Sequence, residues 1–342
     1  TVGGWVVTLG SGQASTYYGD AADLVLSQEY VTPAGDFRTL DYPATATGPK
    51  VGDIMKGAEG AFGILVEVTL RVYRYMPANR RHFSFMFPNW QAAVDASREI
   101  AQGEFGRPAV YRISDPEETD RGLKLYGIPD LADRFLQKRG LAPMARCLCL
   151  GNVEGDRDYT RLVKRKIRRV ARRYGAFNLG PYGSKKWAQT RYREPYMRED
   201  LNDFGITIDT LECAVAWDRL MDLHQHVRAF IKSRPRTMCL THASHFYPQG
   251  TNLYFIFIGR FESVDAYRTF QAGIIDRIQA HGGSLSHHHG IGRLLAPWIE
   301  RHLGREQMAV LRALKRHFDP HRIMNPGGLL GLDTDPEAEG PP

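Results

Sequence analysis

Three consecutive histidines, His287, His288 and His289, are the residues whose type and spacing most clearly indicate chemistry. They lie in the segment GGSLSHHHGIG at residues 282–292, between two glycine-rich turns. Imidazole titrates near neutral pH, exchanges protons and binds metals, and flanking glycines let a backbone bend closely around a flat ligand. Only 12 histidines occur in 342 residues, so composition does not predict this run. The segment indicates a site, with ordinary loop histidines as the alternative. Adjacent side chains diverge, so we expect one or two of the three to face a ligand.

Two glycine-dense segments near the N-terminus could bind a ligand through backbone amides. Residues 1–12 read TVGGWVVTLGSG, and residues 57–63 read GAEGAFG, with Glu59 between the glycines. Successive amides in such loops can hold a phosphate or the edge of a flat cofactor. A structural turn explains residues 57–63 equally well. Neither segment matches a P-loop or a GxGxxG fingerprint.

The composition is that of an ordinary globular chain, with 43% hydrophobic and 24% charged residues and a length that allows two domains. No apolar run reaches the roughly 18–20 residues of a membrane span. The four cysteines fit no zinc-binding spacing and lie in apolar, strand-like runs, so we expect buried, reduced thiols and a reducing compartment. They are Cys147, Cys149, Cys213 and Cys239.

A basic amphipathic helix is predicted over residues 158–174, and it carries much of the net charge of +7. One interpretation is the solvated face of a packed helix. The other is contact with an anionic membrane surface or an acidic ligand. Nucleic acid is not an expected partner, because no aromatic-interleaved basic motif is present. The charges are Lys164, Arg165, Lys166, Arg168, Arg169, Arg172 and Arg173.

The elements that must position these residues form an α+β pattern. Residues 1–75 look β-rich, with strands at 5–8 and 64–73 and a hairpin of 24–32 with 37–40 around PAGD. After a boundary near Pro77, strands alternate with helices. We expect strands at 82–87, 109–113, 147–153, 206–216, 238–245 and 252–258, and helices at 90–102, 158–174, 217–233, 263–281 and 305–317.

Taken together, the motifs resemble the FAD-binding flavoenzymes of the vanillyl-alcohol oxidase superfamily, and within it the alkyldihydroxyacetonephosphate (alkylglycerone-phosphate) synthase family. The resemblance runs from Thr1 to about Leu330. It rests on TVGGW at 1–5, YYGDAADLVL at 17–26, VTPAG at 31–35, GAEGAFGI at 57–64, AWDRL at 216–220, the histidine segment at 282–292 and FDPHRIMNPGG at 318–328.

This resemblance implies a split FAD-binding domain, of which only the C-terminal portion is present, with an inserted antiparallel-sheet cap domain covered by helices. Residues 1–75 are then the second half of the FAD domain, 76–283 the cap, and 284–332 a return to the flavin. We expect residues 333–342, which are acidic and rich in Pro and Gly, to be a disordered tail. The chain starts at Thr1 inside a segment that looks folded, so we expect a fragment of a longer protein whose first half holds the pyrophosphate-binding loop.

The same superfamily contains FAD-linked 2-hydroxyacid dehydrogenases, some of which use two histidines and a glutamate as metal ligands. Here Tyr247 and Tyr254 stand at the two histidine positions, in YPQGTNLY, and His288 stands at the glutamate position. Tyrosine binds divalent metals poorly at neutral pH because its hydroxyl pKa is about 10. We therefore expect no metal at this site. His242 and His245 could form a metal site with the histidine run, but we do not favour one.

What the resemblance implies for individual residues is specific. Tyr254 matches the proposed acid/base, the three histidines match residues needed for activity, and Arg198 matches a substrate-binding arginine. From the residues alone, Tyr254 fits a packed core and Arg198 fits a surface ion pair. Cofactor-binding positions would be Thr1, Thr8, Leu9, Gly10, Ser11, Glu59, Gly60, Ala61, Phe62, Gly63, Ile64, Leu65 and Asn325.

The resemblance implies an enzyme with FAD as cofactor that exchanges the acyl chain of acyl-dihydroxyacetone phosphate for a fatty alcohol, a step of ether lipid synthesis. The main alternative is an FAD-linked oxidase or dehydrogenase of a small 2-hydroxy acid (the D-lactate or glycolate type), with His289 as base. A third hypothesis is a non-catalytic interaction module. We further expect lipid substrates, a homodimer and a cytoplasmic protein with peripheral membrane contact.

Overall fold

A computed structural model describes residues 1–192 and 196–329. The predicted tail at 333–342 and the last residues of the 284–332 segment lie outside this range. The chain divides into two compact units. The first contains Thr1–Gly12, Tyr18–Tyr73 and the chain from Leu285 onward, and the second contains Gln13–Tyr17 and Arg74–Ser284.

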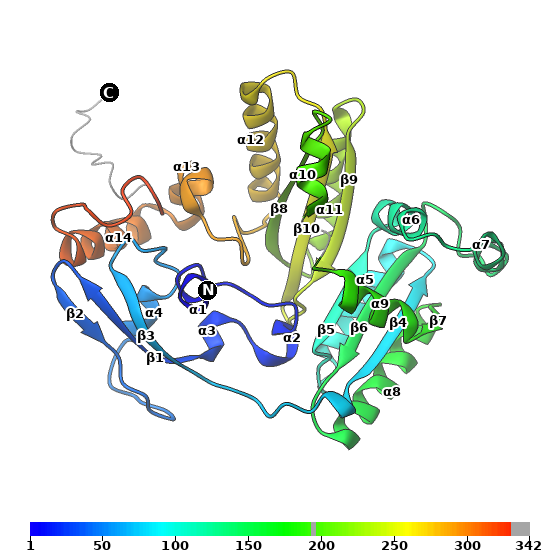
Figure 1. Cartoon of the computed structure of the whole chain (residues 1–342), viewed down its shortest axis with the longest axis horizontal. Coiled ribbons are helices and arrows are strands. Elements are labelled where there is room, and N and C mark those ends of the chain that lie inside the picture. The colour runs from blue at the N-terminus through cyan, green and yellow to red at the C-terminus, as the bar shows by residue number, and fades with distance from the viewer. Residues whose placement is uncertain (193–195, 330–342) are drawn as a thin grey trace. The chain divides into compact units, whose positions relative to one another are not determined.

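The first unit is built on a three-stranded antiparallel sheet in the order β2-β1-β3 (Figure 1). The predicted hairpin is confirmed, since Thr32 of β1 pairs with Gly35 of β2 across the turn. The strands are β1 (Val25–Thr32), β2 (Gly35–Arg38) and β3 (Ile64–Leu70). The helices are α1 (Val2–Val7), α3 (Ala21–Leu24), α4 (Gly52–Met55), α13 (Gly292–Leu303) and α14 (Arg305–Phe318), while α2 (Ser15–Tyr18) is divided between the units.

The strand predicted at residues 5–8 is wrong, because α1 occupies Val2–Val7. The Thr1 hydroxyl caps this helix by accepting a hydrogen bond from the Gly4 amide at 3.1 Å. The Thr8 amide in turn donates to the Gly4 carbonyl at 3.1 Å. An N-cap threonine stabilises a first turn by about 1 kcal/mol, and here it outweighs the strand preference of the neighbouring valines.

The C-terminal helix α14 is joined to the glycine loop by Lys315, which is 3% exposed. Its ammonium donates to the Ala61 carbonyl at 3.0 Å, the Met324 carbonyl at 2.7 Å and the Asp319 carboxylate at 2.8 Å. Asp319, fully buried, also accepts from the amides of Ile323 and Met324. Burial opposes ionisation of Asp319, but the Lys315 hydrogen bond and these amides lower its pKa overall.

The second unit contains a seven-stranded sheet in the order β7-β4-β6-β5-β9-β10-β8, with every neighbouring pair antiparallel. Six of these strands match the predicted runs to within a few residues. The strands are β4 (Arg81–Phe87), β5 (Val110–Ser114), β6 (Cys147–Val153), β7 (Phe177–Gly180), β8 (Thr207–Ala216), β9 (Met238–Ser244) and β10 (Gly250–Gly259).

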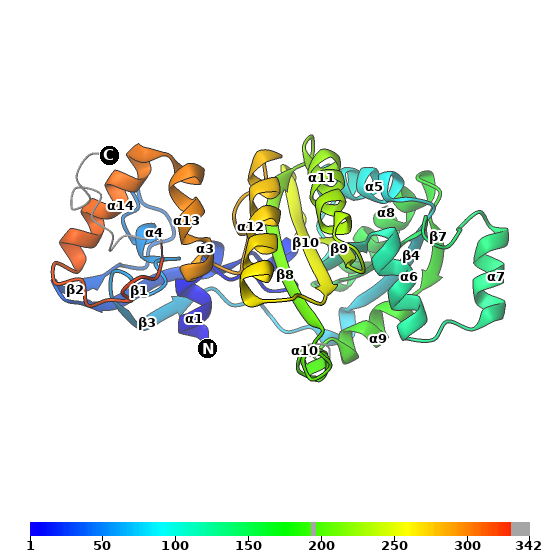
Figure 2. The same ribbon diagram turned by 90° about the horizontal axis from the view of Figure 1, so that it is seen from above.

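The long helices predicted between residues 90 and 281 are confirmed, and they pack on this sheet. Helices α5 (Trp90–Gln102) and α8 (Arg157–Arg173) lie against β4 and β6, while α11 (Leu220–Ser233) and α12 (Val264–Ala280) lie against β8–β10 (Figure 2). The sequence patterns missed β7, α13 and the shorter helical elements of the second unit. These are η1 (Pro77–Asn79), α6 (Pro116–Leu125), α7 (Asp130–Lys138), α9 (Tyr182–Thr190) and α10 (Met197–Asn202).

The alternation of strand side chains separates an apolar face of the sheet from a polar one. Phe255 and Phe257 of β10 and Phe85 of β4 are buried, and so are all four free cysteines, as predicted. Burial raises the pKa of the Cys149 and Cys239 thiols to about 12, so they are chemically inert at neutral pH.

The basic helix α8 is a packed helix with a solvated face. Val163, Ile167 and Val170 are buried, whereas Arg165, Arg168, Arg169, Arg172 and Arg173 are exposed. Its apolar side is therefore occupied within the protein. Across the described part of the chain, no helix combines the length and apolar character that a membrane crossing requires.

Replacing Lys315 tests the buried ion pair. We expect Lys315→Met to lower the free energy of unfolding by about 3–5 kcal/mol, because Asp319 keeps a buried charge without its cation. Urea denaturation at pH 7 measures the loss. Arg316→Met is the control, since Arg316 is exposed on the same helix.

The pair also gives a pH signature. The folded-state pKa of Asp319 lies below the unfolded value of about 3.9. Its contribution is present above that value and disappears as the pH falls through the folded-state pKa. Equal unfolding free energies for Lys315→Met and Arg316→Met would contradict this account.

Candidate active site

Glu59 is the centre of the predicted cofactor loop in the first unit. Its carboxylate accepts hydrogen bonds from the Ile291 amide at 2.6 Å and the Gly292 amide at 2.8 Å. Its own amide donates to Val7 at 2.8 Å, and its carbonyl accepts from the Asn325 side chain at 2.7 Å. Three predicted site segments, the glycine loop, the chain after the histidines and Asn325, are thus brought together. The Glu59 carboxylate is used as a clamp between them.

The glycine loop at 57–63 combines positive φ angles with burial at its C-terminal end. Gly57, Glu59 and Gly60 all have positive φ, and Ala61 and Phe62 are each 1% exposed. The amides of Gly57, Ala58, Glu59 and Ala61 make backbone hydrogen bonds. Those of Gly60, Phe62 and Gly63 make none with backbone acceptors in the described range. Phe62 and Gly63 are buried, so the partly exposed Gly60 amide is the donor that a ligand could reach.

The other predicted cofactor segment packs directly on this loop. Leu9, which has a φ of +50°, lies so close to Gly57 that a Cβ there would come within 2.6 Å of its side chain. Gly10 lies against Trp5, where a Cβ would come within 2.5 Å of the indole. Of the remaining predicted cofactor residues, Ser11 donates to Asp20 at 3.2 Å, Ile64 is 60% exposed and Leu65 pairs with Tyr30.

The histidine run forms a tight turn in the same unit. The Ser286 hydroxyl accepts from the amides of His289 at 3.0 Å and Gly290 at 3.1 Å. His287 and His288 are half-buried with their Nδ1 atoms 3.1 Å apart, whereas His289 is exposed. The ring planes of neighbouring histidines are inclined by 77° and 68°. The expected divergence of adjacent side chains is therefore not seen for His287 and His288, whose Nδ1 atoms approach each other.

Tyr254 lies on the polar face of the sheet in the second unit. Its hydroxyl donates to Thr210 at 3.2 Å, and its ring stacks on His242 with centroids 4.8 Å apart and planes 17° apart. Burial is the main cause of a raised Tyr254 pKa, so the phenol is protonated at neutral pH. The structure thus places a protonated hydroxyl on a face that also carries charged groups.

A buried charge network lies behind Tyr254, and sequence reasoning missed it. Glu118 of α6 contacts Arg112 of β5 at 2.6 Å and His242 of β9 at 3.1 Å. Burial opposes ionisation of Glu118, but Arg112 and then His242 lower its pKa to about 2. Burial and Arg112 together lower the pKa of His242, so it is neutral at pH 7. One sequence signal could have indicated the network. Arg112, His242 and Tyr254 are polar residues within otherwise apolar strands, and alternation along a strand places such residues on one face.

Arg198 and His245 also belong to the second unit. Arg198 is exposed on α10, which packs on β8, and its charge acts on the hydroxyl of Tyr267. His245 is buried with a φ of +54° and lies 2.7 Å from the Ser15 hydroxyl. Tyr247 anchors the turn before β10, since its amide donates to the Gly250 carbonyl at 2.9 Å.

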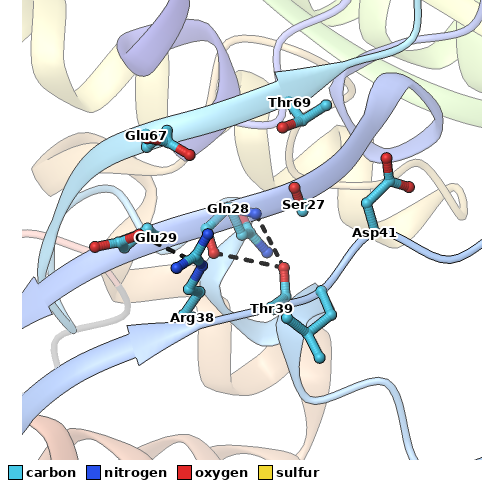
Figure 3. A pocket seen from close by; sticks show the side chains of 9 residues that line it. Ser27, Gln28, Glu29, Arg38, Thr39, Asp41, Glu67 and Thr69 are labelled. Carbon is cyan, nitrogen blue, oxygen red and sulfur yellow. Dashed lines mark hydrogen bonds and ion pairs between the residues drawn. The ribbon is translucent and has the colours of Figure 1, made fainter.

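A separate hollow of about 240 Å³ lies on the sheet of the first unit. Figure 3 shows Arg38, the last residue of β2, and Thr39 after it facing Gln28 and Glu29 of β1. The Gln28 amide donates to the Thr39 hydroxyl at 2.9 Å. None of the predicted site residues lines this hollow.

Comparison with known proteins identifies the family to which the chain belongs. The model of the FAD linked oxidases, C-terminal domain, matches residues 76–329. The chain belongs to this family. It is 32% identical to the alkyldihydroxyacetonephosphate synthase of Dictyostelium discoideum, over 96% of the chain and 56% of the relative. It is 27% identical to that of Caenorhabditis elegans, over 99% and 60%. A solved alkyldihydroxyacetonephosphate synthase structure has a TM-score of 0.77 at 30% identity, covering 95% of this chain and 58% of that one.

The chain therefore spans somewhat more than half the length of these relatives. Membership of the FAD-linked oxidase family confirms the predicted resemblance, the α+β fold of that superfamily and FAD as the cofactor. The residues fit the cofactor. The partly exposed Gly60 amide has no backbone acceptor among the described residues, so it offers a hydrogen-bond donor. A Cβ built at Gly60 would meet only Asn325, at 3.9 Å.

Two glycines of the histidine segment provide a matched test of the clamp. Gly290 and Gly292 both have positive φ, of 81° and 54°. A Cβ at Gly290 would come within 2.6 Å of the Glu59 carboxylate, whereas a Cβ at Gly292 meets nothing within 4 Å. We expect Gly290→Ala to weaken FAD retention at least tenfold, because it displaces Glu59 and with it the loop. Gly292→Ala carries the same kind of backbone strain and should retain FAD better.

Flavin absorbance of the purified full-length holoprotein, followed during dialysis, measures retention. If the two variants lost FAD equally, strain alone would explain the effect, and the clamp would have no role in cofactor binding.

Proposed function

We propose that this chain is the substrate-side portion of an FAD-dependent alkylglycerone-phosphate synthase-like enzyme, which exchanges the acyl chain of acyl-dihydroxyacetone phosphate for a fatty alcohol. The observation that carries the proposal is Tyr254, a protonated phenol on a polar sheet face, stacked on His242. Similarity to alkyldihydroxyacetonephosphate synthases over nearly the whole chain supports it.

The residues suit the proton transfers of this exchange. A proton must leave the carbon beside the ketone, and a proton relay must serve the leaving carboxylate and the incoming alcohol. Tyr254 can donate a proton at its hydroxyl. His287, His288 and His289 each offer an imidazole nitrogen that can accept one. Arg198, exposed and planar, can hold phosphate oxygens through two parallel hydrogen bonds. When bound, FAD supplies a flat ring that can hold or exchange electrons with a substrate carbon.

The alternative is an oxidase or dehydrogenase of a small 2-hydroxy acid with His289 as base. One observation favours it in part, because His289 is the most exposed of the three histidines. The residues that would bind a metal in such enzymes are replaced by Tyr247, Tyr254 and His288, so this chemistry would have to proceed without that metal site. The exchange reaction needs no such site and is preferred.

Removal of the Tyr254 hydroxyl separates these functions. We expect Tyr254→Phe to lower incorporation of labelled hexadecanol into alkyl ether at least 100-fold, the usual scale of general acid–base catalysis, in full-length holoenzyme given acyl-dihydroxyacetone phosphate. Tyr182→Phe, at a tyrosine 72% exposed, is the control. Flavin content must stay equal in both. Full ether synthesis by Tyr254→Phe would refute the assigned role, and bleaching of the flavin by a 2-hydroxy acid without ether synthesis would favour the dehydrogenase.

We also propose that the basic face of α8 holds the enzyme at anionic membrane surfaces, where lipid substrates lie. The apolar side of this helix is buried, so the contact would be electrostatic. Homodimer formation and a cytoplasmic location stay predictions from the resemblance.

The membrane proposal predicts salt-dependent binding. The protein should co-sediment with vesicles that contain 30% phosphatidylserine at low salt. Each arginine near the membrane surface contributes about 1 kcal/mol to the free energy of binding. Charge reversal at Arg168, Arg169 and Arg172 should abolish the co-sedimentation. Neutral vesicles are the control, and unchanged binding of the reversed variant would overturn the idea.

A further inference from the structure

The seam between α11 and α12 carries a cluster of potential metal ligands that the proposed reaction does not use. Asp222 and His226 lie one turn apart on α11, and His281 is the residue that ends α12. All three belong to the second unit. Figure 2 shows the two helices side by side over the sheet. The cluster is therefore a contact between two neighbouring elements of one compact body.

Packing along the seam fixes the separation of the two helices. Phe230 of α11 stacks on Phe270 of α12 with centroids 5.5 Å apart, and the guanidinium of Arg277 lies 5.1 Å above the Phe230 ring. Gly273 approaches Phe230 so closely that a Cβ would come within 2.3 Å of it. Asp222, His226 and Phe230 follow one another at four-residue spacing and so lie on the same face of α11. The packing of Phe230 against α12 therefore also positions Asp222 and His226 beside the end of α12.

The donor atoms of the three residues lie close together. One carboxylate oxygen of Asp222 lies 3.1 Å from Nδ1 of His226, and the other lies 2.6 Å from Nδ1 of His281. The imidazoles stack with centroids 3.9 Å apart and planes 13° apart, and one donor atom from each residue lies within 4.8 Å of the others. Ligand atoms around a tetrahedral zinc ion are about 3.3 Å apart, as bond lengths near 2.0 Å require. The two measured Asp222–histidine separations, 3.1 and 2.6 Å, are close to this spacing.

The chemistry and exposure of the cluster indicate the class of ion. Two imidazoles and one carboxylate suit zinc and other late first-row transition metals rather than magnesium or calcium. The side chains of Asp222, His226 and His281 are 50%, 47% and 22% exposed, so a hydrated ion can reach them and keep water ligands. Nearby Arg219 opposes a bound cation, whereas the carboxylate attracts it. In the metal-free protein the Nδ1 of His226 can donate to the Asp222 carbonyl, 2.9 Å away.

We propose that Asp222, His226 and His281 bind one divalent transition metal ion and thereby join α11 to α12. The site is independent of the proposed synthase activity, since none of its ligands belongs to the histidine run, the tyrosine face or the glycine loop.

Zinc titration of the full-length, chelator-treated holoprotein tests the site by comparison of variants. We expect His226→Asn and His281→Asn each to lose one zinc equivalent, or to bind it at least tenfold more weakly, in isothermal titration. His302→Asn, at an exposed histidine of α13, should keep every equivalent. Comparing stoichiometries removes the contribution of the other histidines. All three variants should melt at the wild-type temperature without metal, because the substituted side chains are at least partly exposed.

A second readout reports the joining of the helices. Zinc should raise the melting temperature of the wild type and of His302→Asn, and this rise should be lost in His226→Asn and His281→Asn. Equal zinc stoichiometry in all variants, or an equal rise in melting temperature, would show that the cluster is an Asp–His hydrogen-bonded group only and would overturn the proposal.

Discussion

The first unit depends on one buried ammonium group. An ammonium has three protons, and Lys315 gives them to three oxygens, those of Ala61, Met324 and Asp319. The first oxygen belongs to the glycine loop and the second to the turn before Asn325, whose side chain in turn binds Glu59. A single helical residue thus contacts both the glycine loop and the turn that carries Asn325. The loop has positive φ at Gly57, Glu59 and Gly60. Two of these strained residues are also held from outside the loop, Gly57 by the Val6 carbonyl and Glu59 by the Val7 carbonyl and Asn325.

The sheet of the second unit has two faces with different roles. One face supplies the hydrophobic core, and the other carries polar and charged side chains. Helices on one face bury Phe85, Phe255 and Phe257, which supplies the hydrophobic stabilisation. The opposite face can then carry charges, provided that they are paired. Glu118 is paired with Arg112 and His242, and Asn252 donates to Glu212 at 2.5 Å. Tyr254 lies among these groups, with its ring stacked on His242 and its hydroxyl bonded to Thr210.

The sequence predicted what depends on local periodicity. Helix α5 and strand β6 match their predicted ranges to the residue, since caps such as Asn89 and runs such as CLCLGNV carry their own signals. Helix α1 was missed because two valines beside a tryptophan resemble a strand, and only the Thr1 cap decides otherwise. Helix α13 contains Pro297, which argues against a helix. The network of Glu118, Arg112 and His242 could not be read from sequence, because its members come from three elements far apart in the chain.

The charge state of that network limits what Tyr254 can do. Arg112 is cationic and Glu118 is anionic at any pH well above about 2, while His242 is neutral at pH 7 because burial and Arg112 lower its pKa. The stacked imidazole therefore adds no positive charge that would make the phenol more acidic. Since its Nδ1 lies within hydrogen-bonding distance of both Glu118 and Arg112, that nitrogen is committed to the network. Tyr254 is left as a proton donor with a raised pKa. The base that the exchange reaction needs must therefore come from another residue. The three histidines carry the side-chain type suited to that role.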